Sequence, residues 1–181
     1  MPNPAYWIEK LNLQPHPEGG HFAEAYRSAE MLEAEALPER FSGPRNIATS
    51  IYFLLRGNDF SAFHRIHSDE TWHYYDGNTS IDIHQLHPDG RHETAHLGIG
   101  GQDALYPQAT IPAGVWFGAE LSRENAPDTE EPWTLVGCTV APGFDFADFE
   151  IAEKPTLNHD YPQHRRIIER LTRHIRESRV E

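Results

Sequence analysis

The sequence is poor in cysteine, in long apolar stretches and in positive charge, and each shortage excludes a class of protein. Cys138 is the only cysteine among 181 residues, so no internal disulfide can form and nothing points to secretion. It lies in the apolar run 133–140, where we expect a small buried side chain on a strand. No apolar stretch approaches the roughly 20 residues that span a bilayer. The first residues do not resemble a signal peptide, and we therefore expect a cytoplasmic protein with no membrane partner.

Basic residues are outnumbered by acidic ones, and the formal net charge is −13 at neutral pH. The segment 161–181 carries six Arg against three Glu, a local +3 that leaves −16 for residues 1–160. A surface this negative repels phosphate backbones, so we expect no nucleic-acid partner.

The apolar content indicates a folded globular protein. It amounts to 38% of the residues and includes 4 Trp, 7 Tyr and 9 Phe. The length suits a single domain over residues 1–181, whose core needs neither disulfides nor a structural metal. We place the core of this domain at about residues 18–152.

Short apolar segments separated by Gly, Pro, Asn and Asp predict an all-β fold. A short helix is expected over 4–11, because Asn3 can cap it and Pro4 suits its first turn. A C-terminal helix is expected over about 161–178, with its apolar stripe at Ile167, Ile168, Leu171 and Ile175. The expected strands cover 21–27, 47–55, 61–66, 70–75, 79–86, 92–97, 108–111, 115–121 and 132–140.

A cluster of histidines and a carboxylate marks the candidate site. His64, His67, Glu70 and His73 lie within ten residues. Imidazole and carboxylate groups bind divalent metals and transfer protons near neutral pH. The cluster is therefore a candidate metal site, a candidate metal-free acid/base site, or a set of structural residues.

This cluster, together with a later Pro-x-Gly turn at Pro112 and Gly114, resembles the two sequence motifs of the cupins. His64 occupies the place of the first histidine of motif one, and Glu70 and Gly77 keep its final spacing. The resemblance implies a double-stranded β-helix, or jelly-roll, barrel.

A closer resemblance, to a branch of the cupins (cupin-5 type) without an agreed activity, runs along nearly the whole chain. It implies a jelly-roll with flanking helices and a homodimer. Its blocks are 16–20, 26–28, 50–55, 64–65, 68–73, 115–117 and 135–146.

The chain departs from the cupin pattern at two of the four usual metal ligands. Ile66 stands at the second histidine of motif one, and Phe117 at the histidine of motif two. His73 could replace a lost ligand beside His64 and Glu70, but strand alternation directs it to the opposite face. We therefore favour no metal and expect no cofactor, while a divalent metal on these three residues is kept as an alternative.

The remaining groups suit a metal-free pocket for a small polar or sugar-like molecule. The chain is distantly similar to cupins of the dTDP-4-dehydrorhamnose 3,5-epimerase kind, which pair a histidine base with a tyrosine acid. That similarity implies isomerase or epimerase activity with His64 as base and Glu70 or Tyr74 as its partner. The candidates for ligand contacts are Tyr52, Trp72, Trp116, Phe117, Glu120 and Arg27.

Two other hypotheses stay open. The protein could be a binding module without catalysis, or a metal-dependent cupin enzyme with a shifted ligand set. The segment around His16 and Glu18 is a secondary candidate, because Gly19 and Gly20 permit a close backbone approach or simply a turn.

Overall fold

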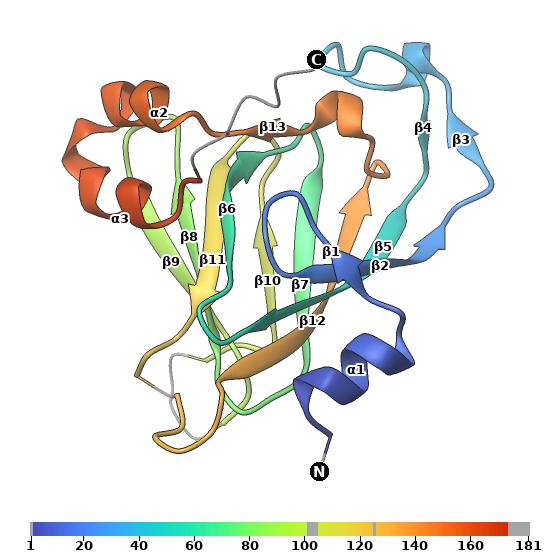
Figure 1. Cartoon of the computed structure of the whole chain (residues 1–181). Helices are drawn as coiled ribbons and strands as arrows, with labels where there is room; N and C mark the ends of the chain where they lie inside the picture. The colour runs from blue at the N-terminus through green and yellow to red at the C-terminus, as the bar shows by residue number, and fades with distance from the viewer. Residues whose placement is uncertain (1, 101–104, 125, 174–181) are drawn as a thin grey trace, which may run out of the picture.

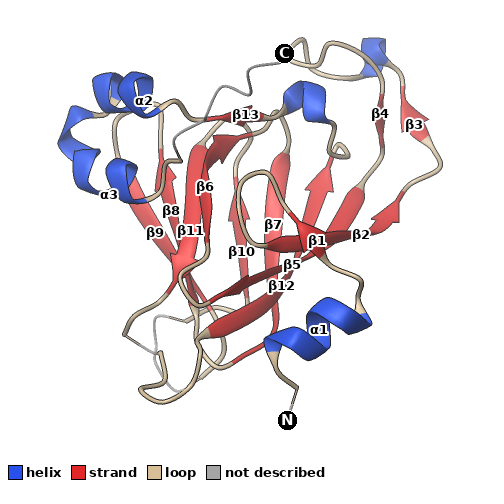
Figure 2. Cartoon of the chain, viewed as in Figure 1, coloured by secondary structure: helices blue, strands red, loops and turns tan. Residues whose placement is uncertain are grey.

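A computed structural model describes residues 2–100, 105–124 and 126–173, and it shows a barrel of two antiparallel sheets (Figures 1 and 2). The six-stranded sheet has the order β1-β2-β5-β12-β7-β10, and the five-stranded sheet has the order β13-β6-β11-β8-β9. A third, two-stranded sheet of β3 and β4 forms an arm beside them.

The strands of the six-stranded sheet are β1 (Gln14–Pro15), β2 (His21–Arg27), β5 (Thr49–Arg56), β7 (Asp69–Gly77), β10 (Gln108–Ile111) and β12 (Trp133–Ala141). Those of the five-stranded sheet are β6 (Phe60–Arg65), β8 (Ile81–Leu86), β9 (His92–Leu97), β11 (Trp116–Leu121) and β13 (Glu150–Ile151). The arm consists of β3 (Met31–Leu32) and β4 (Arg45–Asn46). The helices are α1 (Pro4–Lys10), η1 (Ala34–Ala36), η2 (Phe146–Asp148), α2 (Lys154–Asp160), η3 (Pro162–His164) and α3 (Arg165–Arg170).

The main core fills the space between the two large sheets. Alternate residues of each strand point inward, which is why apolar residues recur at every second position. The largest of the inward side chains, among them Phe53, Trp72 and Phe117, are each about 1% exposed. This core closes one end of the barrel and leaves the other end for the site described below.

Helix α1 packs on the outer face of the six-stranded sheet. Its N-terminus is capped as expected, because Asn3 Oδ1 accepts a hydrogen bond of 2.9 Å from the backbone N–H of Tyr6. Trp7 joins a second apolar cluster with Leu54 and Leu135, which face away from the main core.

The C-terminal helical segment differs from the single expected helix. It begins earlier, at Lys154, and is divided into α2, η3 and α3. Pro162 explains the division, because it cannot donate the backbone hydrogen bond that a continuous helix requires. Ile167 and Ile168 are buried against the outer face of the five-stranded sheet, as expected from the stripe. Residues 174–181, and with them Ile175, lie outside the described part of the chain.

The expected all-β fold with an N-terminal helix and a helical C-terminal segment is confirmed. Each expected strand is present, with ends that differ by at most two residues. Among the described residues, none of the helices is long and apolar enough to cross a membrane.

Candidate functional site

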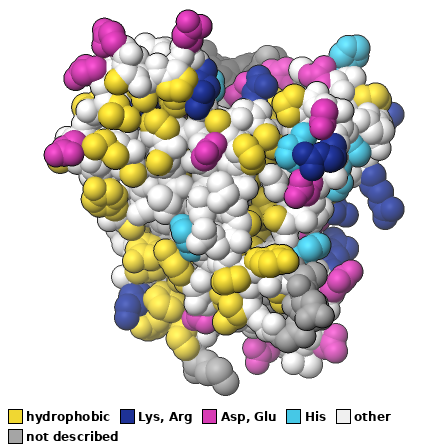
Figure 3. Space-filling model, turned by 180° about the vertical axis from the view of Figure 1, so that it is seen from behind, with side chains coloured by type: hydrophobic (Ala, Val, Ile, Leu, Met, Phe, Trp, Pro, Cys, Tyr) yellow, Lys and Arg dark blue, Asp and Glu magenta, His cyan; other side chains and the backbone are white. Residues whose placement is uncertain are grey.

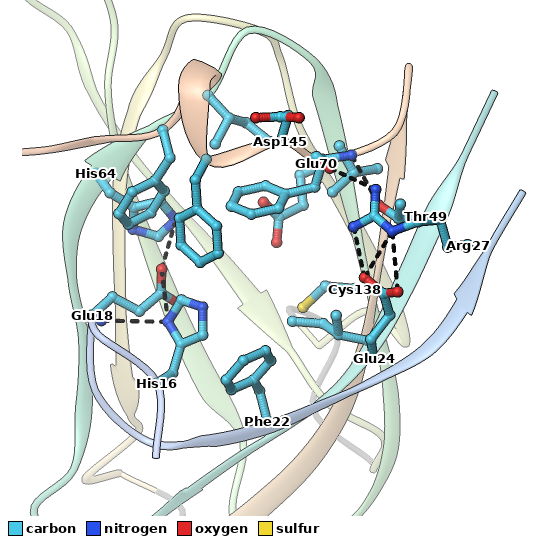
Figure 4. A pocket seen from close by; sticks show the side chains of 16 residues that line it. His16, Glu18, Phe22, Glu24, Arg27, Thr49, His64, Glu70, Cys138 and Asp145 are labelled. Carbon is cyan, nitrogen blue, oxygen red and sulfur yellow. Dashed lines mark hydrogen bonds and ion pairs between the residues drawn. The ribbon is translucent and has the colours of Figure 1, made fainter. Parts of the chain in front are cut away.

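A cavity of about 280 Å³ lies at the open end of the barrel (Figure 4). Strands of both large sheets, the β1–β2 turn and the segment after β12 supply its walls. It is lined by His16, Glu18, Phe22, Glu24, Arg27, Thr49, Ile51, His64, Ile66, Glu70, Cys138, Val140, Phe144, Asp145, Phe146 and Phe149.

A buried histidine–carboxylate pair forms one wall of the cavity. His64 comes from β6, and its Nε2 lies 3.2 Å from Oε2 of Glu18, which comes from the β1–β2 turn. Ser61 Oγ donates a hydrogen bond of 2.9 Å to the other oxygen of Glu18. His16 Nδ1 lies 3.6 Å from Glu18 Oε2 on the opposite side. The carboxyl group of Glu18 is therefore contacted by two imidazoles, which Figure 4 shows, and by the Ser61 hydroxyl.

The hydrogen bonds of His64 determine its tautomer. Its Nδ1 lies 2.7 Å from the carbonyl oxygen of Ala62, which can only accept, so Nδ1 carries a proton. Burial lowers the pKa of His64, although the charge of Glu70 opposes that shift. Burial also raises the pKa of Glu18, against opposing effects of His16, Ser61 and Arg173. Both shifts favour the uncharged forms of the two groups. When both are uncharged, the Glu18 carboxyl group donates a hydrogen bond to Nε2 of His64.

Glu70 projects from β7 into the same cavity. Its pKa is raised to about 7, chiefly by burial and also by the charge of Glu18, while His64 opposes the shift. The thiol of Cys138, whose own pKa burial raises well above its ordinary value, donates to the Glu70 carboxyl group. A carboxyl group with this pKa is present in both its acid and its base form near neutral pH.

Local sequence explains how these groups meet. The β1–β2 turn approaches β6 closely, and Ala62 N–H donates a hydrogen bond of 2.9 Å to the Glu18 carbonyl. Gly19 and Gly20 have φ values of +118° and +67°, which favour glycine. On β6, alternation places His64 toward the cavity with Ile66 two residues later, as expected from the sequence.

The cavity mouth is lined by charged side chains. Arg27 donates from Nε and Nη2 to the carboxylate of Glu24, with Nη2 at 2.6 Å. Its Nη1 donates to Asn46 Oδ1 at 2.9 Å and to the carbonyl of Phe144 at 3.1 Å. Four of the five N–H groups of the guanidinium are therefore directed at protein acceptors.

Three of the residues expected from the sequence line this cavity: His64, Glu70 and Arg27. Trp72 and Phe117 lie in the main core behind it. The Phe117 ring centre is 4.1 Å from that of His64, so Phe117 supports the imidazole without lining the cavity.

The structure places the other expected contact residues elsewhere, and this corrects their assignment. On each strand, side chains point alternately to the inside and the outside of the barrel. The outward positions include Tyr52, Trp116 and Glu120. Tyr52 packs near α1, and Trp116 packs beneath α2 and α3. Glu120 pairs with His84 at 3.3 Å and with Arg170.

Tyr74 faces inward but lies toward the opposite end of β7. It is four positions after Glu70, and four positions correspond to about 13 Å along a strand. Its hydroxyl donates a hydrogen bond of 3.1 Å to the carbonyl of Gly77. Tyr74 therefore cannot act as the acid that partners His64 in this cavity.

The residues present do not fit the usual cupin metal site. Two ligand positions are taken by the apolar side chains of Ile66 and Phe117. His73, the expected substitute, hydrogen-bonds Thr139 at 3.2 Å and does not line the cavity. Within the described ranges, no three His, Cys, Asp or Glu side chains are arranged to hold a metal ion.

Sequence reasoning underestimated two groups of residues. His16 and Glu18 were only secondary candidates, because the sequence does not tell which strand their turn approaches. The aromatic residues Phe22, Phe144 and Phe149 were not singled out at all. The only signal was for Phe144, which lies in the block 135–146 of the cupin resemblance.

Proteins with a similar sequence are found in a bacterium and in two eukaryotes, and two of them have solved structures with a similar fold. The chain is 35% identical to a protein from Shewanella oneidensis, whose X-ray structure matches 96% of this chain and 99% of that one with a TM-score of 0.82. A hypothetical protein from Leishmania major is 32% identical, with a TM-score of 0.84 and coverage of 96% and 100%. An uncharacterised Saccharomyces cerevisiae protein is 29% identical over 168 residues, or 82% of this chain and 76% of that protein. Residues 5–152 match the family described as Cupin superfamily (DUF985), and the chain therefore belongs to the cupin superfamily.

Proposed function

We propose that the cavity binds a small carbonyl compound and catalyses its metal-independent isomerisation or epimerisation. The observation that carries this proposal is the convergence of three buried ionisable groups, His64, Glu18 and Glu70, on one cavity. These side chains are 2%, 6% and 8% exposed, so water screens their charges little. Such an arrangement is typical of sites that transfer protons.

The reaction needs two proton-exchange sites. One site removes the proton from the carbon beside the carbonyl, and the electron pair of that C–H bond forms an enolate. The other site returns a proton to carbon from a different direction. Glu70 is one of the two proton-exchange sites. The pair of His64 and Glu18, which shares a proton, is the other.

In this proposal, the residue that acts as the acid differs from that in cupins of the dTDP-4-dehydrorhamnose 3,5-epimerase kind. Those enzymes pair a histidine with a tyrosine, whereas Tyr74 lies too far along β7 to serve. Glu70 takes the place of the tyrosine, because its pKa of about 7 makes it an effective acid and base.

Binding without turnover is the second candidate. It is favoured by the contact between His64 Nε2 and Glu18, which occupies the lone pair that a catalytic histidine would use. The two candidates differ in whether a bound carbonyl compound exchanges its carbon-bound protons with water.

The decisive experiment is hydrogen–deuterium exchange at carbon. Small ketones and keto sugars, together with any compound that copurifies with the protein, are incubated with it in deuterated water and analysed by mass spectrometry and NMR. We expect deuterium at the carbon beside the carbonyl. Glu70→Gln and His64→Asn should slow the exchange by roughly 10²–10⁴-fold, as for loss of a general acid or base.

Glu120→Gln is the matched control, because it disrupts a histidine–glutamate pair of similar length, with His84, outside the cavity. Its exchange rate should equal that of the unmodified protein. If a ligand that binds the cavity exchanges no carbon-bound proton, catalysis is rejected and the binding module is retained.

A further inference from the structure

The ionisable groups of the cavity are mostly carboxyl groups. Glu18 and Glu70 lie deep in it, and Glu24 and Asp145 lie exposed at its mouth (Figure 4). Among its described lining residues, Arg27 is the single Lys or Arg. The site therefore offers an excess of negative or proton-sharing oxygen atoms to a ligand.

Most of the hydrogen-bonding capacity of Arg27 is used by the protein. Glu24 accepts from its Nε and Nη2, and Asn46 and the Phe144 carbonyl accept from its Nη1. A phosphate or carboxylate that approached Arg27 would come close to the carboxylates of Glu24 and Asp145, which would repel it. This arrangement disfavours phosphorylated and carboxylated ligands.

The remaining walls of the cavity are apolar and rich in aromatic rings. Phe22, Phe144, Phe146 and Phe149 line it, and the ring of Phe22 points into it (Figure 4). Phe144, Phe146 and Phe149 form a contiguous group, with ring centres 5.1–6.0 Å apart. Aromatic faces attract cations, and the attraction increases when water is excluded.

We infer that the ligand of this cavity carries a positively charged nitrogen, such as an ammonium group, on a small apolar body. The nitrogen lies against Glu70, and the body packs against the phenylalanines. This inference deepens the proposed function and rests on the same cavity being the binding site. It directs the search for the carbonyl substrate toward amino ketones and amino sugars, and away from phosphates.

Cation binding at this site is coupled to proton release. Glu70 is faced by His64, Glu18, Cys138 and Trp72, and Glu18 is faced also by His16, Ser61 and Arg173. Burial lowers the pKa of His64 and of His16, so these imidazoles are already neutral at pH 7. Raising the pH past 7 therefore removes the proton of Glu70, and the resulting negative charge favours a cation. A ligand that stays protonated should therefore bind more tightly as the pH rises past 7.

Three probes of similar size test the charge preference: 2-phenylethylamine, 2-phenylethanol and phenylacetate. Their affinities are measured by NMR titration and calorimetry at pH 6 and pH 8. We expect the amine to bind at least tenfold more tightly than the alcohol at pH 8, and phenylacetate to bind most weakly. The affinity for the amine should rise about tenfold from pH 6 to pH 8, because Glu70 ionises over that range.

Glu70→Gln separates the charge effect from the shape of the cavity. It should weaken amine binding at least tenfold and remove most of its pH dependence, while alcohol binding changes less than twofold. Glu120→Gln is the control and should change neither the affinity for the amine nor the affinity for the alcohol. Thermal unfolding verifies that both variants are folded. Tighter binding of phenylacetate, equal binding of amine and alcohol at pH 8, or no amine binding at millimolar concentration overturns the inference.

These results are independent of the exchange experiment above. Amine binding without carbon-bound exchange supports the ligand class and rejects catalysis. Exchange of a neutral or anionic carbonyl compound, without amine binding, supports catalysis and rejects the ligand class.

Discussion

Glu70 shows how a single residue can serve a site at the expense of stability. Its carboxyl group is buried, and its folded-state pKa is about 7 instead of the ordinary 4.5. The folded protein therefore keeps this proton to a higher pH than the unfolded chain does. The contribution of Glu70 to stability falls as the pH rises from 4.5 to 7, and the loss is complete above that range. It amounts to roughly 3 kcal/mol for a shift of this size.

Glu70→Gln should accordingly stabilise the protein at high pH. We expect the free energy of unfolding of this variant to match that of the unmodified protein near pH 4.5 and to exceed it by roughly 3 kcal/mol at pH 8. Urea denaturation at the two pH values measures the difference.

The control variant, Glu120→Gln, should show the opposite dependence of stability on pH. Burial raises the pKa of Glu120, but His84 and Arg170 outweigh it, and the net pKa is lowered. Glu120→Gln should therefore lose stability at pH 8 relative to acidic pH. A stability difference for Glu70→Gln that does not grow with pH would contradict the burial of a protonated carboxyl group.

At the scale of elements, the β1–β2 turn decides the geometry of the site. It crosses to β6, where Ala62 N–H and Arg173 Nε both donate to the Glu18 carbonyl, at 2.9 and 3.1 Å. A Cβ atom at Gly19 would collide with the carbonyl oxygen of Phe60. The turn can approach β6 this closely only because a glycine, with φ of +118°, occupies that position.

Gly19→Ala should push the turn away from β6 and destabilise the protein by about 1–3 kcal/mol. The Ala62 amide loses its acceptor, so its hydrogen exchange should become faster, as NMR can measure for that single residue. Gly43→Ala is the control, because the nearest atom to its added Cβ is a side-chain nitrogen of Arg45 at 3.7 Å. Equal stability and equal exchange in the two variants would show that the turn is not held by close packing.

At the scale of the whole molecule, helices cover both sheets but the arm keeps exposed apolar side chains. Helix α1 lies on one sheet, and α2 with α3 lies on the other (Figure 1). On and beside the arm, Tyr26, Met31 and Ile47 are 55%, 51% and 40% exposed. Seen from behind, hydrophobic side chains gather along the edge of the molecule on this side (Figure 3). An exposed apolar surface of this kind is typical of a protein interface.

We expect the protein to form a homodimer through the arm. Light scattering after size exclusion should give twice the chain mass of 20.7 kDa. Ile47→Asp should give a monomer, because it places a charge in the proposed contact. Ile99→Asp, at another exposed apolar position, should leave the dimer intact. A monomeric unmodified protein, or a dimer that tolerates Ile47→Asp, would refute this contact.

The sequence by itself determined the positions of the nine longer strands and the alternation of side chains along each of them. It did not indicate the two-residue strands β1, β3, β4 and β13. Alternation related His64 to Ile66, and Glu70 to Trp72 and Tyr74, because successive side chains on a strand point to opposite faces. The turn residues separated the strands, and the ordered blocks indicated the cupin fold. These features depend on neighbours in the chain, and so they can be predicted from a single sequence.

Only the tertiary structure decided which of these residues share a cavity. Tyr74 faces the same side as Glu70 but lies at the other end of the barrel, which alternation alone does not reveal. Glu18 is 46 positions before His64 and reaches it because a turn folds across the barrel. Burial then raises the pKa of Glu70, and that burial depends on packing between segments that no local pattern encodes.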